Sequence, residues 1–322
     1  MDEFEGVAHA AQLLSNGELV VIPTETVYGL AANAYDDKAV GSIFQAKNRP
    51  ATNPLILHIK DLSELPKVAR DIPLIAWQLA EKFWPGPLTL ILNKQPHISD
   101  LVSANHSTVA VRVPNHPLTL HLLESLSFPL VAPSANRSNH ISPTSAEHVY
   151  QSLGENTPFV LDGGPCSAGV ESTIIGFDGD QAVLYRYGAL QEKEIEAITG
   201  RPLLYHTNLK EQGISPGSSR KHYSPETSLV ISDTLTREYE SSYKRIGYLV
   251  LNKTFDVNPQ HVLIELSPSG SMEEAASNLY AALHELDKLK LDLIVAQRFP
   301  DAGLGKTIND RLNRAASIEK FR

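Results

Sequence analysis

Residues 108–114 read TVAVRVP, a mostly β-branched run that predicts a strand with an arginine inside it. Successive side chains of a strand point to opposite faces of the sheet, so Arg112 faces one side among apolar neighbours. Arg186 repeats the arrangement in VLYRYG, residues 183–188. A partly buried guanidinium needs an anionic partner. A structural carboxylate would meet that need, and so would an anionic ligand in a cavity.

Further short strands surround this one in the sequence, at PLTLIL (87–92), FPLVA (128–132) and STIIGF (172–177). Helical spacing and start signals predict helices between them. Helices mixed with many short strands, some adjacent in sequence, indicate an α/β domain with a mixed, partly antiparallel sheet. The first predicted helix is amphipathic and ends at Asn16-Gly17, and the second covers residues 37–46 with Asp37 as its cap. Three further helices are predicted at residues 73–84, 116–126 and 145–152. A strand is predicted at residues 55–59.

A second pair of cations lies in KNRP, where Lys47 and Arg49 are one residue apart. Pro50 and Pro54 restrict the backbone around them, so the loop can present its charges at fixed positions. A solvated surface loop is the simpler interpretation of this pair alone. Together with the two strand arginines, however, the pair favours a cationic cavity. PSANRSNHISPT at 133–144 adds hydroxyls and turn amides that suit phosphate oxygens, although its own internal hydrogen bonds would also explain it.

The composition limits what such a cavity serves. The chain has 322 residues, 37 acidic and 28 basic side chains and a net charge of -9, which argues against a general binder of nucleic-acid backbones. The single cysteine, Cys166, excludes an intramolecular disulfide and a cysteine-rich zinc site, and fits a reducing, cytoplasmic location. No apolar stretch approaches the roughly 20 residues that cross a bilayer, so no membrane role is expected.

The chain changes character after residue 200. Residues 201–227 are rich in Gly, Pro, Ser and polar residues without a clear period, which predicts an ordered linker between a domain of residues 1–200 and one of residues 228–322. In the last segment, four predicted strands and a long helix at 271–290 indicate a small three-layer α/β domain of Rossmann-like type. GLGKT at 303–307 lacks the earlier glycine of a phosphate-binding loop, because residue 300 is proline, and is interpreted as a helix start.

Nearly the whole chain resembles the Sua5/YrdC/YciO family of threonylcarbamoyl-AMP synthases. The resemblance rests on motifs that are weak singly and specific together. They are PTETVYGLAANA (23–34), KNRP (47–50), NPLILH (53–58), WPGPLTLIL (84–92), VAVRVPNHP (109–117), PSAN (133–136), GVESTI (169–174), YRYGAL (185–190), SPG...HY in the linker and GLGKTINDRLNRAA (303–316). The length resembles the two-domain Sua5 type.

The resemblance implies a YrdC-like catalytic domain whose twisted mixed sheet and helices surround a basic cavity. It implies a nucleotidyltransferase that makes L-threonylcarbamoyladenylate and diphosphate from L-threonine, bicarbonate and ATP, for the t6A base at position 37 of tRNA. The product would pass to a tRNA threonylcarbamoyltransferase machinery, and direct tRNA binding stays open. Mg²⁺ would arrive with ATP, held by phosphate oxygens and water, without a protein ligand set.

Carried over by motif, the resemblance also implies site residues. The catalytic pair would be Lys47 and Arg49, holding the triphosphate. ATP would be bound by Arg49, Asn53, Thr108, Ser134, Asn136, Ser142, Arg186 and Tyr223, and threonine by Thr26, His58, Arg112, Ala132 and Ser172, with Arg112 at the threonine carboxylate.

The linker would act as a lid, with His222 and Tyr223 contacting the ligands in a closed state. Ser218 and Ser219 stand where the family commonly has a bulkier residue and a cation, which affects the expected packing of that lid. Asn139 stands where a glycine often follows the Ser-x-Asn motif. Asparagine tolerates a left-handed backbone, so the turn is expected to form.

Two alternatives from other classes compete with synthesis of the adenylate. An RNA-binding module of the same fold would show tight, salt-sensitive tRNA binding without ATP turnover, but the net acidity and the lack of Lys/Arg clusters weigh against it. A carbamoyl transferase of hydrogenase maturation would carry zinc fingers with cysteine pairs, which a chain with one cysteine does not have.

Overall fold

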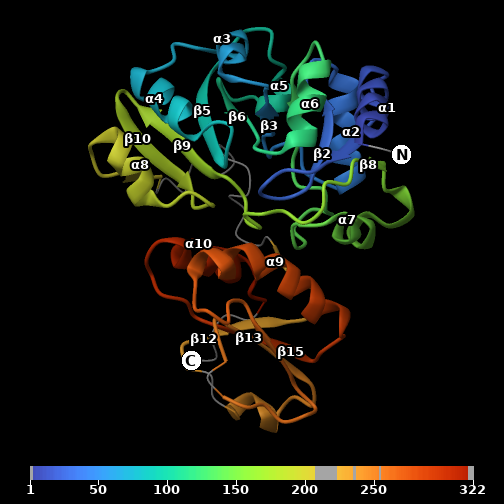
Figure 1. Cartoon of the computed structure of the whole chain (residues 1–322), viewed down its shortest axis with the longest axis vertical. Coiled ribbons are helices and arrows are strands. Elements are labelled where there is room, and N and C mark those ends of the chain that lie inside the picture. Colours follow the sequence, from blue (N-terminus) through green and yellow to red (C-terminus); the bar gives the residue numbers. More distant parts are fainter. Residues whose placement is uncertain (1–2, 207–222, 235–236, 254, 318–322) are drawn as a thin grey trace.

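The computed structural model describes residues 3–206, 223–234, 237–253 and 255–317. They form two domains, one built from residues up to Tyr205 and one built from residues 229–315 (Figure 1). The predicted linker of residues 201–227 falls largely on residues 207–222, which lie outside the described residues. Its lid role, with His222, Ser218 and Ser219, therefore remains a prediction. No helix within the described ranges combines the length and apolarity that a membrane span requires.

The first domain wraps short helices around a mixed sheet. Among the described residues this sheet has 11 strands in the order β11-β10-β9-β5-β6-β3-β7-β2-β1-β8, with β4 paired to β5. Antiparallel pairs such as β5/β6 stand beside parallel ones such as β3/β6 and β5/β9, which confirms the predicted mixed sheet. The strands are β1 Val20–Ile22, β2 Gly29–Asn33, β3 Ile56–His58, β4 Ala69–Arg70, β5 Leu88–Lys94, β6 Thr108–Arg112, β7 Leu130–Val131, β8 Phe159–Val160, β9 Thr173–Asp178, β10 Gln181–Arg186 and β11 Leu204–Tyr205.

The helices of this domain begin and end close to where capping and periodicity place them. They are α1 Glu3–Ser15, α2 Asp37–Lys47, α3 Leu65–Val68, α4 Leu74–Phe83, α5 Asp100–Ser103, α6 Pro117–Ser125, α7 Ala146–Leu153 and α8 Glu192–Thr199, with 3-10 turns η1 Leu62–Glu64 and η2 Gly154–Asn156. One detail of the predictions was wrong. The cap of α2 is Asp36, whose side chain accepts from the amides of Lys38 and Ala39. On α1 the buried face is Val7, Ala10 and Leu14, whereas Phe4 is 74% exposed.

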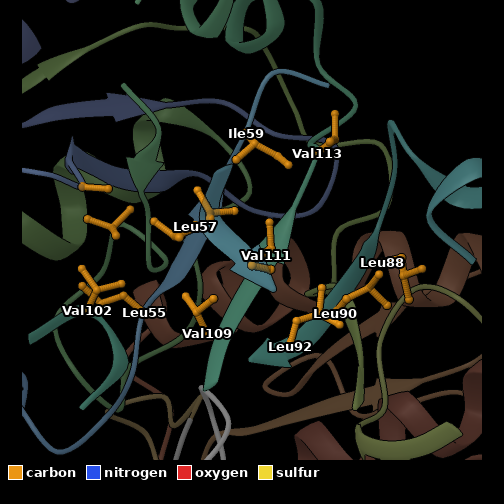
Figure 2. Close-up of a cluster of buried hydrophobic side chains, with 14 of the residues drawn as sticks. Leu55, Leu57, Ile59, Leu88, Leu90, Leu92, Val102, Val109, Val111 and Val113 are labelled. Atoms are coloured by element: carbon orange, nitrogen blue, oxygen red, sulfur yellow. The ribbon is translucent and has the colours of Figure 1, made fainter. Parts of the chain in front are cut away.

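Alternation along the central strands sorts the side chains into two faces. Leu57 on β3, Leu90 on β5 and Val111 on β6 belong to one buried cluster, which Figure 2 shows gathered with their neighbours from the same strands. Helices α2, α4 and α8 contribute residues to that cluster. The residues between them, such as His58 and Arg112, face the other side of the sheet, because side chains alternate along a strand. The site is built on this second face.

The second domain is a four-stranded parallel sheet, in the order β12-β15-β13-β14. Its elements are β12 Leu229–Ser232, η4 Arg237–Ser241, β13 Ile246–Val250, β14 Val262–Glu265, α9 Met272–Lys288, β15 Leu293–Gln297 and α10 Leu304–Ala315. Helices α9 and α10 lie between this sheet and the first domain (Figure 1). On the opposite face, Tyr239 and Tyr243 in and beside η4 pack against the sheet, which gives the third layer.

The two domains are joined by polar contacts along α9 and α10. The Thr307 hydroxyl donates to the Gly188 carbonyl at 2.9 Å, and Lys306 pairs with Glu192 at 2.7 Å. The imidazoles of His148 and His284 stack with their centroids 4.0 Å apart. At one point the backbones touch, because a Cβ on Gly169 would lie 2.0 Å from the carbonyl oxygen of Ser277. The second domain therefore abuts the segment of residues 167–192, which carries part of the site.

Candidate functional site

A small cavity opens on the second face of the sheet, between the central strands and the turn at residues 132–134. It measures about 60 Å³, well below the roughly 300–1,000 Å³ of typical ligand pockets. Its wall carries three arginines, one histidine and one acid. The lining residues are Thr24, Thr26, Val27, Gly29, Arg49, Pro54, Leu55, Ile56, His58, Arg112, Ala132, Pro133, Ser134, Glu171, Ser172, Arg186 and Tyr223.

Arg112 lies where strands β3 and β6 run side by side, directly opposite His58 in the parallel register. Its guanidinium donates to the Thr26 hydroxyl at 2.9 Å and to the Gly86 carbonyl at 3.3 Å, and it forms an ion pair with Glu25. Both members of the ion pair are more than nine-tenths buried. The predicted structural carboxylate therefore exists for Arg112, while one edge of the same side chain still faces the cavity.

His58 is uncharged in this environment. Burial, and then the positive charge of Arg112, lower the pKa of His58 to about 3. Its Nδ1 lies 3.2 Å from the Ile56 carbonyl. A neutral imidazole at this position contributes a hydrogen bond and shape, and it adds no charge to the cationic wall.

Arg186 reaches the cavity because strand β10 contains a bulge. Leu184 pairs with Ile175 on the core face, but Arg186 pairs with Ile174 on the cavity face, so Tyr185 is the extra residue. Bulges of this kind turn a following side chain to the other face of the sheet. The guanidinium then donates to the Ser172 carbonyl at 2.9 Å and to the Ser172 hydroxyl at 3.1 Å.

Of the three arginines that line the cavity, Arg49 has the fewest hydrogen-bond partners among the described residues. Its Nη2 donates to the Pro54 carbonyl at 3.0 Å, whereas its buried Nε has no hydrogen-bond partner within the part of the chain that the structure describes. Burial lowers the pKa of Arg49 to about 10, and the neighbouring Arg186 acts in the same direction. A buried guanidinium in this state is a site for an anion.

Lys47 lies behind the cavity wall rather than in it. Its ammonium donates to the backbone carbonyls of Ser134 and Asn136, and the side chain is 1% exposed. Burial, and then the charge of Arg49, lower the pKa of Lys47 well below its usual range. The lysine thus fixes the turn that brings Ser134 into the wall.

Glu171 is the acid of the wall, and the second domain holds it. Its carboxylate accepts from the Ser142 hydroxyl at 2.7 Å, from the Tyr280 hydroxyl at 2.9 and 3.0 Å, and from Arg311 Nε at 2.7 Å. Tyr280 lies on α9 and Arg311 on α10. The Arg311 guanidinium also lies 4.9 Å from the ring centre of Tyr223.

The structure brings together most of the residues that the family motifs nominated. Nine of them line the cavity, namely Thr26, Arg49, His58, Arg112, Ala132, Ser134, Ser172, Arg186 and Tyr223. Lys47, Asn136 and Ser142 are buried just behind it, while Asn53 and Thr108 are half-buried outside its lining. Glu171, Tyr280 and Arg311 were not nominated. The signal for Arg311 was its place on the apolar face of a helix, three residues after Ile308 and seven after Leu304.

The secondary signals agree with their simpler interpretations. Asn139 has the expected left-handed backbone, with φ 70°, and its carbonyl accepts from the Ser224 amide at 2.9 Å. GLGKT starts helix α10 with Gly303 as the cap residue. Burial raises the pKa of the Cys166 thiol to about 12, which suits an inert packed cysteine.

Two family models together match almost the whole chain. The Sua5/YciO/YrdC model, described as telomere recombination, matches residues 12–188. The model described as threonylcarbamoyl-AMP synthase, C-terminal domain, matches residues 190–317.

Individual relatives are similar over the same extent. A threonylcarbamoyl-AMP synthase of Bacillus subtilis is 41% identical, over 96% of this chain and 92% of the relative. A protein of Pyrococcus abyssi with the same name is 37% identical, over 95% and 93%. The crystal structure of P. abyssi Sua5 complexed with L-threonine has a TM-score of 0.89 and 36% identity, covering 99% of this chain and 97% of that one.

Proposed function

Because this chain belongs to the Sua5/YciO/YrdC family, we propose that it is a threonylcarbamoyl-AMP synthase, which makes its product and diphosphate from L-threonine, bicarbonate and ATP. The observation that carries the proposal is Arg49, a buried cation whose Nε has no hydrogen-bond partner among the described residues, in the same cavity wall as Arg186 and Arg112. Three cations around one small hollow exceed what the acids of the wall neutralise. They suit a polyphosphate beside a carboxylate.

The amino acid would bind on the β3/β6 side of the cavity. Arg112 is the group for the threonine carboxylate, with Thr26 and Ser172 offering hydroxyls nearby. Glu25 already neutralises Arg112 on the opposite side, so threonine would share the guanidinium with that acid. The P. abyssi Sua5 complex with L-threonine supports an amino-acid site in this fold.

The nucleotide would bind on the side of Arg49, Ser134 and Arg186. Tyr223 is the wall residue that belongs to the predicted linker of residues 201–227. Its backbone φ of 63° is unfavourable for an aromatic residue, which is the kind of local strain that functional segments retain.

The chemistry asks the protein for positioning and charge rather than for a strong base. The uncharged threonine amine attacks the carbon of bicarbonate or carbon dioxide to give a carbamate, with loss of water from bicarbonate. A carbamate oxygen then attacks the α-phosphorus of ATP, and the bond to diphosphate breaks. Arg49 and Arg186 would stabilise the charge that grows on the leaving diphosphate. Lys47 would act from behind, through the Ser134–Asn136 turn.

Magnesium would enter as the ATP complex. Among the described residues, no group of three or more acids, histidines or cysteines is placed to hold a metal ion. Glu171, the acid in the wall, already accepts hydrogen bonds from three side chains. We therefore assign the ion to phosphate oxygens and water, and no step to a protein-held metal.

The product would serve tRNA modification. We propose that a separate tRNA threonylcarbamoyltransferase machinery consumes the adenylate, and that the protein works in the cytoplasm, where its single cysteine stays reduced.

The test is direct detection of threonylcarbamoyl-AMP by mass spectrometry from purified protein, ATP, Mg²⁺, threonine and bicarbonate. Reactions without threonine or without bicarbonate are the controls, and neither should yield the adenylate or diphosphate. If the complete reaction gives no adenylate while the protein binds tRNA tightly in a salt-sensitive gel shift, the RNA-binding alternative replaces this function.

A further inference from the structure

A buried charge pair joins the cavity to the second domain. Glu171 lines the cavity, and its side chain is 8% exposed. Arg311, on α10 of the second domain, is 1% exposed and donates to that carboxylate at 2.7 Å. Tyr280, on α9, adds hydrogen bonds at 2.9 and 3.0 Å. The second domain thus touches a residue of the site directly.

The surroundings of Arg311 fix it in this role. Its Nη2 donates to the Tyr187 carbonyl at 2.7 Å, its Nη1 pairs with Asp310, and its planar face lies against the ring of Tyr223. Burying an arginine this fully is costly unless every donor finds a partner. Here the donors contact the first domain at Glu171 and Tyr187, so the arginine is built into the interface rather than into the core of its own domain.

The charge of Glu171 creates a problem that Arg311 solves. Ser172, the next residue, accepts two hydrogen bonds from Arg186 through its carbonyl. Glu171 and Arg186, the arginine that is assigned to the nucleotide, line the same cavity, and their charges act on each other. An uncompensated carboxylate there would pair with Arg186 and repel phosphate. Burial alone would raise the pKa of Glu171, but the charges of Arg311 and Arg186 lower it to about 2, so the acid stays ionised.

We propose that Arg311 is a positioning residue: it binds Glu171 and thereby keeps this carboxylate from competing with the triphosphate for Arg186, so that nucleotide affinity depends on the second domain. The inference rests on the proposed function for the identity of the nucleotide. It gives the second domain a specific task, which is to supply one cation and one hydroxyl to the back of the ATP side of the cavity.

The experiment measures the ATP dissociation constant by calorimetry, which requires no turnover, and the KM values for ATP and threonine by diphosphate release. Arg311→Gln should weaken ATP about tenfold or more, because the freed carboxylate then competes for Arg186. The KM for threonine should change less than about twofold. Arg314→Gln is the matched control, since Arg314 lies on the same helix and pairs with Asp310.

The decisive variant is the double substitution Glu171→Gln with Arg311→Gln. It removes the competing carboxylate together with its partner, so ATP affinity should return to within about threefold of wild type. A purely structural role of Arg311 predicts the opposite result, because a second substitution in the domain interface would weaken ATP binding further. Failure of the double variant to recover affinity overturns the proposal, as does an ATP affinity of Arg311→Gln equal to that of wild type.

A milder variant keeps the test decisive if Arg311→Gln does not fold. Tyr280→Phe retains the ring and removes only the hydroxyl that donates to Glu171, so ATP affinity should fall about threefold with threonine unchanged. Unchanged ATP affinity in this variant also overturns the proposal. If wild-type protein binds ATP but makes no threonylcarbamoyl-AMP, the proposed function fails while the dissociation constants still decide the role of Arg311.

Discussion

Replacing Gly169 by alanine should force the two domains apart at the contact between Gly169 and Ser277. Gly169 lies in the segment before Glu171, with a left-handed φ of +64°, and an added Cβ would lie 2.0 Å from the Ser277 carbonyl oxygen and 2.6 Å from its carbonyl carbon. Ser277 belongs to α9. Its hydroxyl donates to the Ser167 carbonyl at 2.9 Å, so a hydrogen bond joins the two domains beside this contact. Backbone on both sides leaves no flexible side chain to yield, so α9 must retreat by roughly 1 Å or more.

The cost follows from three contributions. A left-handed backbone costs alanine about 1 kcal/mol more than glycine. Overpacking of a close contact adds about 1–3 kcal/mol, and loss of the Ser277 hydrogen bond adds about 1 kcal/mol. We therefore expect Gly169→Ala to lower the free energy of unfolding by about 3 kcal/mol or more. Since α9 also carries Tyr280, ATP affinity should fall with it.

Gly164→Ala is the matched control. Gly164 also has a left-handed φ, +77°, but a Cβ there meets nothing within 4 Å, so only the backbone cost of about 1 kcal/mol applies. Urea denaturation of both variants and ATP titration of both give the comparison. Equal stability and equal ATP affinity of the two variants would refute the close domain contact in solution.

The remaining predictions concern single groups of the site. Arg112→Ala should raise the KM for threonine by about 10- to 100-fold and leave ATP binding nearly unchanged, and a selective loss of ATP affinity would reverse the assigned sides. Arg49→Ala should weaken ATP about 30-fold in calorimetry, whereas unchanged binding would remove it from the triphosphate site. Glu171 has its pKa lowered from 4.5 to about 2, so its stabilising contribution is present above pH 4.5 and is lost as the pH falls towards 2. In urea denaturation at a series of pH values, the free energy of unfolding should therefore fall less steeply with decreasing pH for Glu171→Gln than for wild type. Identical slopes of unfolding free energy against pH would contradict the ion pair. Cys166 should resist iodoacetamide in native protein and react in urea, as its thiol is buried with a pKa of about 12, and rapid native alkylation would contradict that burial.

Strand alternation was enough to predict part of the site. The alternation of apolar and polar positions along β6 places Arg112 on the opposite face of the sheet from Val111. The structure confirms that Arg112 faces the cavity. The same rule fails in detail for β10. Simple alternation would place Arg186 on the core face with Ala182 and Leu184, and the bulge at Tyr185 moves it to the cavity face. Nothing in the strand's own residues specifies that extra residue, because its pairing partner is a separate strand.

The sequence also did not predict which residues line the cavity and which support its wall from behind. Lys47 and Arg49 are one residue apart, yet α2 ends at Lys47 and Asn48 has a left-handed backbone with φ 50°. That left-handed residue directs Arg49 into the cavity and Lys47 to the backbone carbonyls of Ser134 and Asn136. Only the turn geometry separates their roles, because Arg49 lines the cavity and Lys47 supports the turn behind it.

Contacts between the domains were the least predictable part. The family motif that contains Arg311 marks the residue without saying which partner it meets. Glu171 is 140 residues earlier in the chain, and no local pattern joins positions at that separation. The one usable signal was the charged residue on the apolar face of a predicted helix, since such a residue requires a buried partner somewhere in the fold.

That separation in sequence has a consequence for biosynthesis. Domains generally fold as units in the order in which they leave the ribosome, so the large sheet and its carboxylate at Glu171 are complete before the codon for Arg311 is translated. A nascent or prematurely terminated polypeptide that lacks α10 would leave the Glu171 carboxylate without its Arg311 partner, beside the arginines of the cavity wall. Maturation of the nucleotide site is then coupled to completion of the last helix, and fragments are held in an unproductive state.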